Sequence, residues 1–353
     1  MKLGLGFHRN RINRDNFRFA RQAGCTHVVV HLVERLREGL PPTADEFCFG
    51  VTRARGAVWS FDELTTVKKL ANDEDLQLEA LENIDPSFWC DILLDGPRKS
   101  QQLEALKTLL RSMGRLRIPI LGYCFSLAGV WGRLDKPLAR GAASVPVFQA
   151  DHPLRDQPLP HGQLNNIVYD TGAPANSIAA ISREELWQRL EGFLKALVPV
   201  AEAEGVRLAA HPDDPPVPML RQTPRLLHQP EHLDRLLKLV PSPANALEFC
   251  AGTIQEMANA DLYEVADRYS RQRAIAYVHC RNVIGKAPHY REAFIDEGEI
   301  DVPRLLRILH RNGFDGVVIP DHAPQMTCDA PWHAGMAHAL GYLRAILNMI
   351  SVT

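Results

Sequence analysis

The chain has 353 residues, of which 46% are hydrophobic and 23% charged, a composition that fits a soluble enzyme with a large buried core. Its formal net charge of −2 and its pI near 6.7 provide no basic excess, which argues against nucleic acid and anionic membranes as partners. We expect no transmembrane helix and no signal peptide, because no apolar run is long enough and charges begin within the first ten residues. The seven cysteines are odd in number and scattered, which favours a reducing cytoplasm over a disulfide framework.

Short apolar runs recur along the whole chain, and each is nearly continuous, as expected for strands buried on both faces. They cover residues 2–7, 27–32, 76–82, 118–125, 206–211, 245–250, 275–279 and 317–321. The segments between them have apolar residues at three- and four-residue intervals, which predicts amphipathic helices. These segments are 14–24, 61–75, 98–116, 182–205, 231–240, 262–272, 302–313 and 334–350. The alternation predicts an α/β fold, a closed (β/α)8 TIM barrel.

Two connections, residues 33–60 after the second strand and 126–181 after the fourth, are too long to be plain turns. Both follow strands, so we expect these insertions over the mouth of the barrel, where substrate loops belong. We predict one domain spanning 1–353, in which the insertion 126–181 acts as a lid or an inter-subunit arm. The alternative is a disordered insertion without function. Symmetric assembly is common among enzymes, and we therefore expect a homo-oligomer.

Four side chains of metal-ligand type stand at the downstream ends of the last four predicted strands: His211, Cys250, His279 and Asp321. Because the ends of parallel barrel strands converge around one mouth, these side chains are expected to form one site. A single such residue is more often a core residue, but four at successive strand ends predict a divalent-metal centre. By ligand softness alone, a thiolate with two imidazoles and a carboxylate favours Zn²⁺ or Fe²⁺ over the harder Mn²⁺.

Several polar residues near the strand ends are candidates for substrate binding. Arg133 and Arg225 match a carboxylate best, because the guanidinium fork fits its two oxygens; the alternative is a solvated loop arginine. Asp213 either orients a ligand or caps a proline-rich turn. Arg281 and Asn282 either bind polar substrate groups or finish a turn. Weaker candidates, for which core packing is the alternative, are His8, Tyr123 and Trp131.

Several motifs resemble the mannonate dehydratase family. They are His-Pro-Asp-Asp-Pro-Pro at 211–216 with Pro-Arg at 224–225, Leu-x-x-Cys-x-Gly at 247–252, Val-His-x-Arg-Asn-Val at 278–283, Gly-Phe-Asp-Gly at 313–316 and Pro-Asp-His at 320–322. In the first half, Tyr123, Phe125, Trp131 and Arg133 are retained, and Glu82 stands where the family has a glutamate at the end of its third strand. The resemblance covers most of the chain and indicates a divergent member of that family.

The resemblance implies a xylose isomerase-like barrel that removes water from D-mannonate, a sugar acid, to give 2-keto-3-deoxy-D-gluconate in hexuronate catabolism. It implies Mn²⁺, with Fe²⁺, Co²⁺ or Zn²⁺ as alternatives, held by His211, Cys250, His279 and Asp321. It also implies His322 as a catalytic acid or base. The chemistry agrees, because a weakly acidic C2 proton needs a nearby cation and a group that titrates near neutrality. The family's catalytic tyrosine falls near His333, the second catalytic candidate, and Glu82 is a candidate substrate ligand.

The chain departs from the family mainly on the substrate side. The family's Arg-Trp-Tyr segment on the first strand is replaced by Gly6, Phe7 and His8, which removes one expected contact with the substrate carboxylate. Cys124 and Val130 replace an asparagine and an aspartate. These departures leave two alternatives open. One is an isomerase or epimerase of a sugar or sugar derivative on the same scaffold, and the other is a non-catalytic sugar-acid binder.

Overall fold

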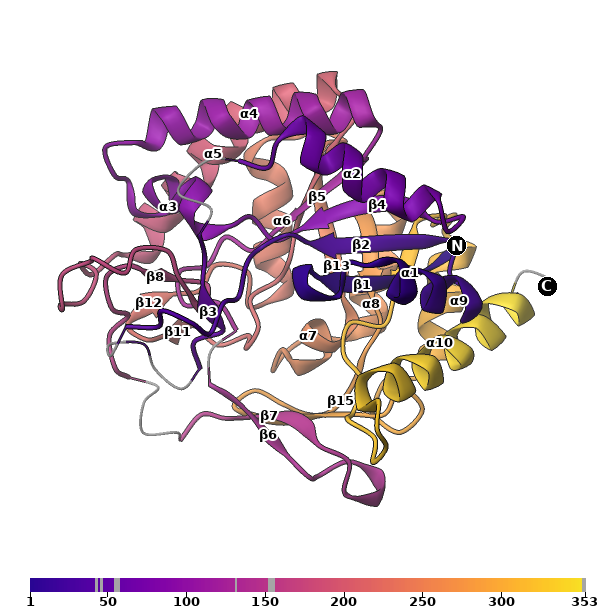
Figure 1. Ribbon diagram of the computed structural model, residues 1–353. Helices are drawn as coiled ribbons and strands as arrows, with labels where there is room; N and C mark the ends of the chain where they lie inside the picture. The colour runs from indigo at the N-terminus through magenta and orange to yellow at the C-terminus, as the bar shows by residue number, and fades with distance from the viewer. Residues whose placement is uncertain (42–43, 45–46, 54–57, 131, 152–155, 351–353) are drawn as a thin grey trace.

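The computed structural model describes residues 1–41, 44, 47–53, 58–130, 132–151 and 156–350. At its centre eight parallel strands close into a barrel, as Figure 1 shows for β1, β2 and β4 lying side by side. In barrel order the strands are β1 (Lys2–His8), β2 (His27–His31), β4 (Gln77–Glu82), β5 (Ile120–Tyr123), β10 (Arg207–Ala210), β13 (Asn245–Cys250), β14 (Ile275–His279) and β17 (Val317–Ile319). The predicted strands and the predicted (β/α)8 barrel are confirmed.

Helices surround the barrel (Figure 1). They are α1 (Arg14–Gln22), α2 (Phe61–Asn72), α3 (Pro86–Leu94), α4 (Lys99–Leu116), α5 (Arg183–Ala203), α6 (Pro230–Leu239), α7 (Ala251–Glu256), α8 (Leu262–Arg271), α9 (Val302–Arg311) and α10 (Pro331–Ile350), with short 3-10 turns at Arg9–Arg11 and Arg140–Ala142. The sequence pattern missed α3 and α7. Their residues are almost all buried, so neither helix has the polar face that reveals an amphipathic pattern. None of the helices in the described ranges is long and apolar enough to cross a membrane.

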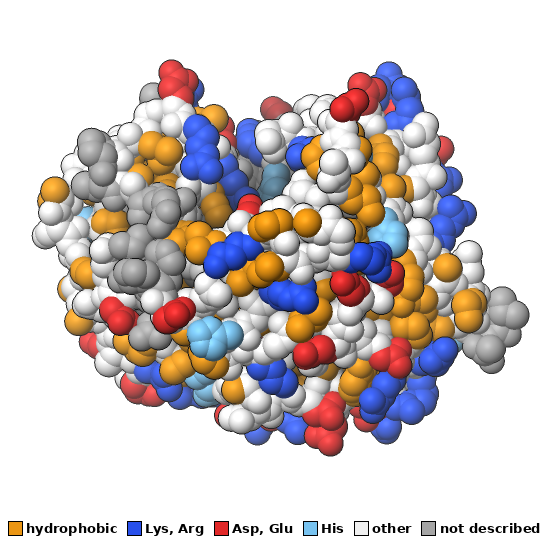
Figure 2. Space-filling view, turned by 90° about the horizontal axis from the view of Figure 1, so that it is seen from below, with side chains coloured by type: hydrophobic (Ala, Val, Ile, Leu, Met, Phe, Trp, Pro, Cys, Tyr) orange, Lys and Arg blue, Asp and Glu red, His pale blue; other side chains and the backbone are white. Residues whose placement is uncertain are grey.

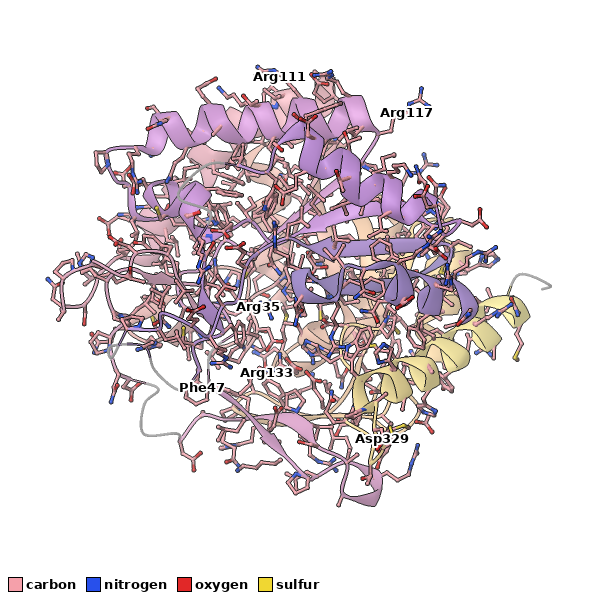
Figure 3. All side chains as sticks on the ribbon, in the orientation of Figure 1. Arg35, Phe47, Arg111, Arg117, Arg133 and Asp329 are labelled. Carbon is pink, nitrogen blue, oxygen red and sulfur yellow. The ribbon has the colours of Figure 1, made fainter. Side chains whose placement is uncertain are left out.

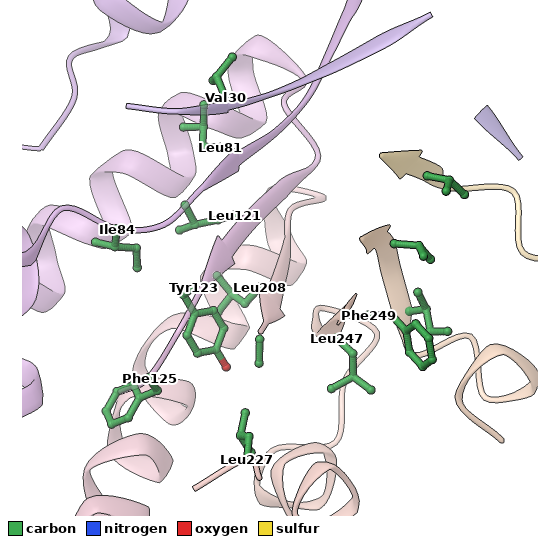
Figure 4. Close-up of a cluster of buried hydrophobic side chains, with 14 of the residues drawn as sticks. Val30, Leu81, Ile84, Leu121, Tyr123, Phe125, Leu208, Leu227, Leu247 and Phe249 are labelled. Carbon is green, nitrogen blue, oxygen red and sulfur yellow. The ribbon is translucent and has the colours of Figure 1, made fainter. Parts of the chain in front are cut away.

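Side chains along each barrel strand alternate between the barrel interior and the surrounding helices. The inward set forms a small core of Val29, Ala80, Ile120, Ala209, Ala246, Ala276, Tyr277, Val317 and Ile319. The outward set packs under the helices, and Figure 4 shows part of it, including Val30, Leu81, Leu121, Leu208 and Leu247. Polar residues two positions after the inward set therefore point into the barrel above this core, towards the ends of the strands.

The insertions form small sheets next to the barrel. Two strands of the second insertion, β6 (Arg133–Lys136) and β7 (Val145–Gln149), pair antiparallel with each other, and β7 pairs with β16 (His289–Ala293), which pairs with β15 (Asn282–Lys286). Figure 1 shows β6, β7 and β15 below the barrel. The strand β3 (Gly50–Val51) of the first insertion pairs with β9 (Ile167–Val168), which pairs with β8 (Gln163–Leu164). The pairing of β3 with β9 joins the two insertions to each other. A separate hairpin joins β11 (Met219–Leu220) and β12 (Thr223–Pro224).

Candidate active site

The four predicted metal ligands come together at the ends of β10, β13, β14 and β17. One ligand atom from each of His211, Cys250 and His279 lies within 4.8 Å of the other two. Asp321 adjoins this group, because its Oδ2 is 3.5 Å from Nδ1 of His279 and 4.0 Å from Sγ of Cys250. Convergence of strand ends, which the sequence predicted, is therefore what assembles this cluster.

Both imidazole rings are oriented by hydrogen bonds on the side that faces away from the cluster. Nδ1 of His211 donates to the carbonyl of Pro212 at 2.6 Å, so that in the neutral ring the lone pair is on Nε2. Nε2 of His279 donates to a carboxylate oxygen of Glu82 at 3.1 Å. Nδ1 of His279 is buried and has no hydrogen-bond partner in the described part of the chain. Each ring thus turns one nitrogen towards the cluster, as a metal-binding histidine requires.

Cys250 is placed and ionised by its surroundings. It caps the N-terminus of α7, where its Sγ accepts hydrogen bonds from the hydroxyl of Thr253 at 3.1 Å and the backbone N–H of Thr253 at 3.5 Å. Burial alone would raise the pKa of the Cys250 thiol, but the guanidinium of Arg281 and the two imidazoles hold that pKa well below its usual value. The thiolate is the form that binds metals. This donor set fits a divalent transition-metal ion.

Two buried glutamates lie behind His279, on the side opposite the cluster. Glu82, the predicted substrate ligand, accepts from His279 as described above, and Glu248 Oε1 is also 3.1 Å from the same Nε2. Burial and the neighbouring charge of Glu82 raise the pKa of Glu248 to about 8. The structure therefore gives Glu82 a position from which it orients a ligand. Glu248 was missed, although it stands two residues before Cys250 on one strand and so shares its inward face.

Arg281, a predicted substrate contact, is buried directly beside the cluster. Its guanidinium lies 2.7 Å from Asp214, 2.5 Å from Glu256 and 3.1 Å from Asp321. All three partners are carboxylates of the chain, so Arg281 has little capacity left for a substrate. Its contacts instead hold Asp321 in place and supply the positive charge that ionises Cys250.

Arg133, one of the two predicted carboxylate ligands, is also paired within the chain. Its Nη1 lies 2.9 Å from Asp214, and its Nη2 forms an ion pair with Glu292. Only 8% of its side chain is exposed. A substrate carboxylate would have to compete with both of these anions for the same guanidinium.

Arg225, the other predicted carboxylate ligand, is completely buried. It donates to the hydroxyl of Ser126 at 2.8 Å and the carbonyl of Gly129 at 2.6 Å, and lies 3.3 Å from Asp213. Asp213 in turn accepts from the backbone N–H of Leu227 at 2.7 Å. These contacts fasten the start of the second insertion to the loop after β10, and they fit the turn-stabilising interpretation of Asp213.

His322 lies beside the metal-ligand group on a more open side, with 40% of its side chain exposed. Its Nδ1 donates to Glu292 Oε1 at 2.8 Å, and its Nε2 is 3.4 Å from Asp321 Oδ1. Glu292, which the sequence did not reveal, comes from β16 in the sheet beside the barrel. With Nδ1 bonded to this carboxylate, Nε2 carries the lone pair that can accept a proton.

The ends of β1 and β2 contribute a different kind of surface. The ring of His8 lies 4.4 Å from the ring of His31, and its Nε2 is 3.5 Å from Nη1 of Arg35. Burial, followed by the electrostatic effect of the neighbouring His31 and Arg35, lowers the pKa of His8 well below its usual value. His8 is thus part of the mouth of the barrel, together with two residues that the sequence pattern missed. Figure 2 shows the molecule from below, with a hollow between two raised parts and Lys or Arg side chains at its edge.

Two other predicted substrate residues have their polar atoms inside the core. Tyr123 faces outwards, as Leu121 two residues earlier does (Figure 4). Its ring centroid lies 5.2 Å from that of Phe193 under the helices. The amide of Asn282 donates to the carbonyls of Ile295 and Ile300, both at 2.9 Å. Both positions are those of packing or turn residues.

The second catalytic candidate, His333, lies at the start of α10 against α1. Its Nε2 donates to the side-chain oxygen of Asn16 at 2.9 Å, and its ring meets that of Phe19 edge-on at 5.0 Å. Among the described residues, its hydrogen bond and ring contacts involve neither the predicted metal ligands nor His322. Trp131, predicted to contact the substrate, lies outside the residues that the structure describes.

The chain is similar in sequence to known proteins. The family described as D-mannonate dehydratase (UxuA) matches residues 21–352. Mannonate dehydratase 2 of Halalkalibacterium halodurans is 29% identical over 314 residues, which cover 84% of this chain and 90% of that protein. Mannonate dehydratase of Streptococcus equi subsp. zooepidemicus is 28% identical over 286 residues, which cover 78% of this chain and 77% of that protein.

Solved structures share the fold. The crystal structure of mannonate dehydratase from Streptococcus suis serotype2 superposes with a TM-score of 0.79 at 23% identity and covers 99% of this chain and 93% of its own. The D-psicose 3-epimerase of Clostridium cellulolyticum H10 superposes with a TM-score of 0.55 at 12% identity and covers 100% of this chain and 99% of its own. At these identities the likeness concerns the barrel architecture alone.

Proposed function

This chain belongs to the D-mannonate dehydratase (UxuA) family, and we propose that it converts D-mannonate to 2-keto-3-deoxy-D-gluconate and water in a metal-dependent reaction. The observation that carries the proposal is the cluster of His211, Cys250 and His279, whose ligand atoms lie within 4.8 Å, with a carboxylate and a further histidine beside it. Ligand types alone would fit many metalloenzymes. Their combination with the family membership selects a sugar-acid dehydratase.

We propose that His211, Cys250, His279 and Asp321 hold the metal. A divalent cation bound there would act as a Lewis acid towards the substrate carboxylate and an adjacent hydroxyl. Glu82 keeps the ring of His279 turned so that Nδ1 faces the cluster. Arg281 holds the carboxylate of Asp321 beside the cluster, because its Nε donates to Oδ2 of Asp321 at 3.1 Å.

His322 is the proposed proton-transferring group. The dehydration breaks the C2–H bond and the C3–O bond, and the C3 hydroxyl leaves as water after it gains a proton. The enol that forms then gives the 2-keto product by proton transfer to C3. Because Nδ1 of His322 is bonded to Glu292, Nε2 can take the C2 proton, and the resulting imidazolium can return a proton to the departing hydroxyl. His322 serves as base or acid in this scheme.

The proposed metal is Mn²⁺, on the strength of the family, although the thiolate and the two imidazoles would by softness favour Zn²⁺ or Fe²⁺. Rates measured after reconstitution with Mn²⁺, Fe²⁺, Co²⁺ or Zn²⁺ in separate samples decide between them. The highest rate with Mn²⁺ is the expected result, and a higher rate with another of these ions would replace Mn²⁺ in the proposal.

We further propose that residues 1–353 are one domain, that residues 126–181 act as a lid or an inter-subunit arm, and that the chain forms a homo-oligomer. The pairing of the second insertion with β16 and β3 supports a fixed place for it beside the barrel. All seven cysteines are free, which supports a reducing, cytoplasmic setting. Light scattering during size-exclusion chromatography tests the oligomer, and deletion of a part of the insertion tests its role.

The central experiment incubates the metal-reconstituted protein with a panel of aldonic acids and measures the 2-keto-3-deoxy product. We expect the highest rate with D-mannonate. Absence of product from every acid would contradict the proposal. In that case, exchange of the proton next to a carbonyl without loss of water would identify an isomerase or epimerase, and tight binding without turnover a sugar-acid binder.

A further inference from the structure

The arginines at the mouth of the barrel differ in whether the chain itself neutralises them. Three of them form ion pairs with carboxylates of the chain. Arg133 lies 2.9 Å and Arg281 2.7 Å from Asp214, and Arg225 lies 3.3 Å from Asp213. A guanidinium that is already bonded to a buried carboxylate gains little from a substrate carboxylate, because the first anion would be left unpaired. These three arginines are therefore poor anchors for an acidic substrate.

Arg35, in the insertion that follows β2, has no such partner. It forms no ion pair within the described residues, and its Nε is buried without a hydrogen-bond partner in the same part of the chain. Its contacts are a ring nitrogen of His8 at 3.5 Å and the ring of Phe49 at 4.7 Å. Burial lowers the pKa of Arg35 to about 10, which leaves it charged at neutral pH. The charge of Glu82 acts on Arg35 in the opposite direction, but no carboxylate of the described residues pairs with it directly, and a partly buried cation without a direct partner is costly unless a ligand supplies one.

Arg35 also lies on the correct side of the barrel. His8, which it contacts, ends β1, and the paired strand β17 leads directly into Asp321 and His322. The neighbouring His31 lies 3.5 Å from Glu82, which bonds to His279. Arg35 therefore lies on the part of the barrel mouth next to the residues proposed to carry out proton transfer and metal binding. Figure 3 labels Arg35 and Arg133, both in the central part of this view of the molecule.

We propose that Arg35 binds the carboxylate of the substrate and thereby selects aldonic acids over neutral sugars. The inference rests on the proposed function for the identity of the substrate and extends it to a residue that recognises the acid group. A guanidinium can donate two parallel hydrogen bonds to a carboxylate, and the Nε of Arg35 has no acceptor among the described residues, while Nη1 has only the long contact with His8. The neighbouring rings of His8 and His31 would wall the same subsite.

The test compares binding of D-mannonate with binding of its uncharged amide, D-mannonamide. Isothermal titration uses Mn²⁺-loaded full-length protein that carries His322→Asn, so that the ligand is not consumed. Addition of Arg35→Ala is expected to weaken D-mannonate binding between about tenfold and a hundredfold and to leave the amide nearly unaffected. Arg35→Lys, which keeps the charge but loses the fork, is expected to lie in between.

The matched control is Arg53→Ala, which removes an exposed arginine of the same insertion that is paired with Glu38. It is expected to change neither affinity. Thermal unfolding separates recognition from structure, because loss of an unneutralised cation should not lower the Tm. Equal weakening of both ligands together with a lower Tm would show a structural role for Arg35, and unchanged affinity for D-mannonate would also overturn the inference.

The outcome is separable from that of the proposed function. If the unmodified protein forms no dehydration product but binds aldonic acids through Arg35, the proposed function fails and the inference stands. If product forms and Arg35→Ala leaves the KM for D-mannonate unchanged, the proposed function stands and the inference fails.

Discussion

The two sides of the barrel mouth differ in whether their arginines form ion pairs with carboxylates of the chain. On the side of β10, β13, β14 and β17, ligands and arginines are interlocked, as in the contacts of Arg281 with Asp214, Glu256 and Asp321 at 2.7, 2.5 and 3.1 Å. On the side of β1 and β2, Arg35 makes no ion pair within the described residues. Charges that are neutralised internally hold other groups in place, whereas an unneutralised charge is free to bind a ligand. The comparison supports the proposals that the first side binds the metal and that the second side recognises the acid group.

The largest effect is expected when a ligand of the interlocked side is removed. Loss of a residue that only orients a metal ligand typically costs tenfold to a hundredfold in affinity, so Cys250→Ala should cost more than about a hundredfold. Metal content after dialysis and the rate of product formation measure it. The control is Cys328→Ala, which changes an exposed free cysteine and should retain full metal content. Full metal occupancy in the Cys250 variant would contradict the proposal that Cys250 is a metal ligand.

A smaller loss, confined to kcat, is expected at His322. General acid–base catalysis contributes about 10²–10⁴-fold, so His322→Asn should lower kcat by that factor while metal content remains unchanged. The matched control is His333→Asn, because His333 bonds to Asn16 on α1 and should leave kcat intact. A reversed result, with His333 essential and His322 dispensable, would support the catalytic role that the family resemblance implies for His333.

Substitution of Glu82 tests whether this buried carboxylate affects metal binding through its hydrogen bond to His279, a proposed metal ligand. Glu82→Gln keeps the shape of the side chain but removes the charge that His279 Nε2 meets at 3.1 Å. Metal affinity should fall about 10–100-fold, as for other partners of metal-bound histidines. Competition with a metal chelator measures this affinity. Glu79→Gln, three residues earlier on β4, is the control. Normal metal affinity combined with a raised KM for D-mannonate would instead indicate the direct substrate contact first expected for Glu82.

The smallest effect on substrate recognition is expected at Arg225, in contrast with Arg35. Arg225→Met leaves Asp213 buried without its cation, which should lower the free energy of unfolding by about 3–5 kcal/mol. The KM for D-mannonate should stay close to that of the unmodified protein at a temperature where both are folded. Denaturant unfolding and steady-state kinetics provide the two values. A raised KM without loss of stability would return Arg225 to the role of carboxylate ligand.

Fold, family and the ligand cluster were accessible from sequence because each depends on local or topological regularities. Buried parallel strands are continuously apolar, and a strand's last residue must lie at the mouth of a closed barrel. His211, Cys250, His279 and Asp321 could therefore be grouped without coordinates, although their role as metal ligands stays a prediction. Glu248 could have been added by the same reasoning, since it shares an inward face with Cys250.

Other assignments needed the tertiary structure. Tyr123 was expected at the site. Side chains alternate along β5, however, and Tyr123 is on the outward-facing side of the strand, in the core under the helices. Arg133 and Arg225 were expected to bind the substrate carboxylate, yet their partners Glu292 and Asp213 occupy them. The sequence pattern does not indicate a role for Arg35, because a single arginine in an irregular loop belongs to no periodic pattern.

The barrel, its strand ends and the family of this chain can be predicted from residue order, since they follow from hydrophobic periodicity and local motifs. Which charges are paired becomes known only from the folded arrangement. Pairing depends on distances between segments far apart in the chain, such as the β6 and β16 strands that bring Arg133 to Glu292. The strength of an ion pair varies inversely with distance and dielectric, and neither quantity is encoded in residue order.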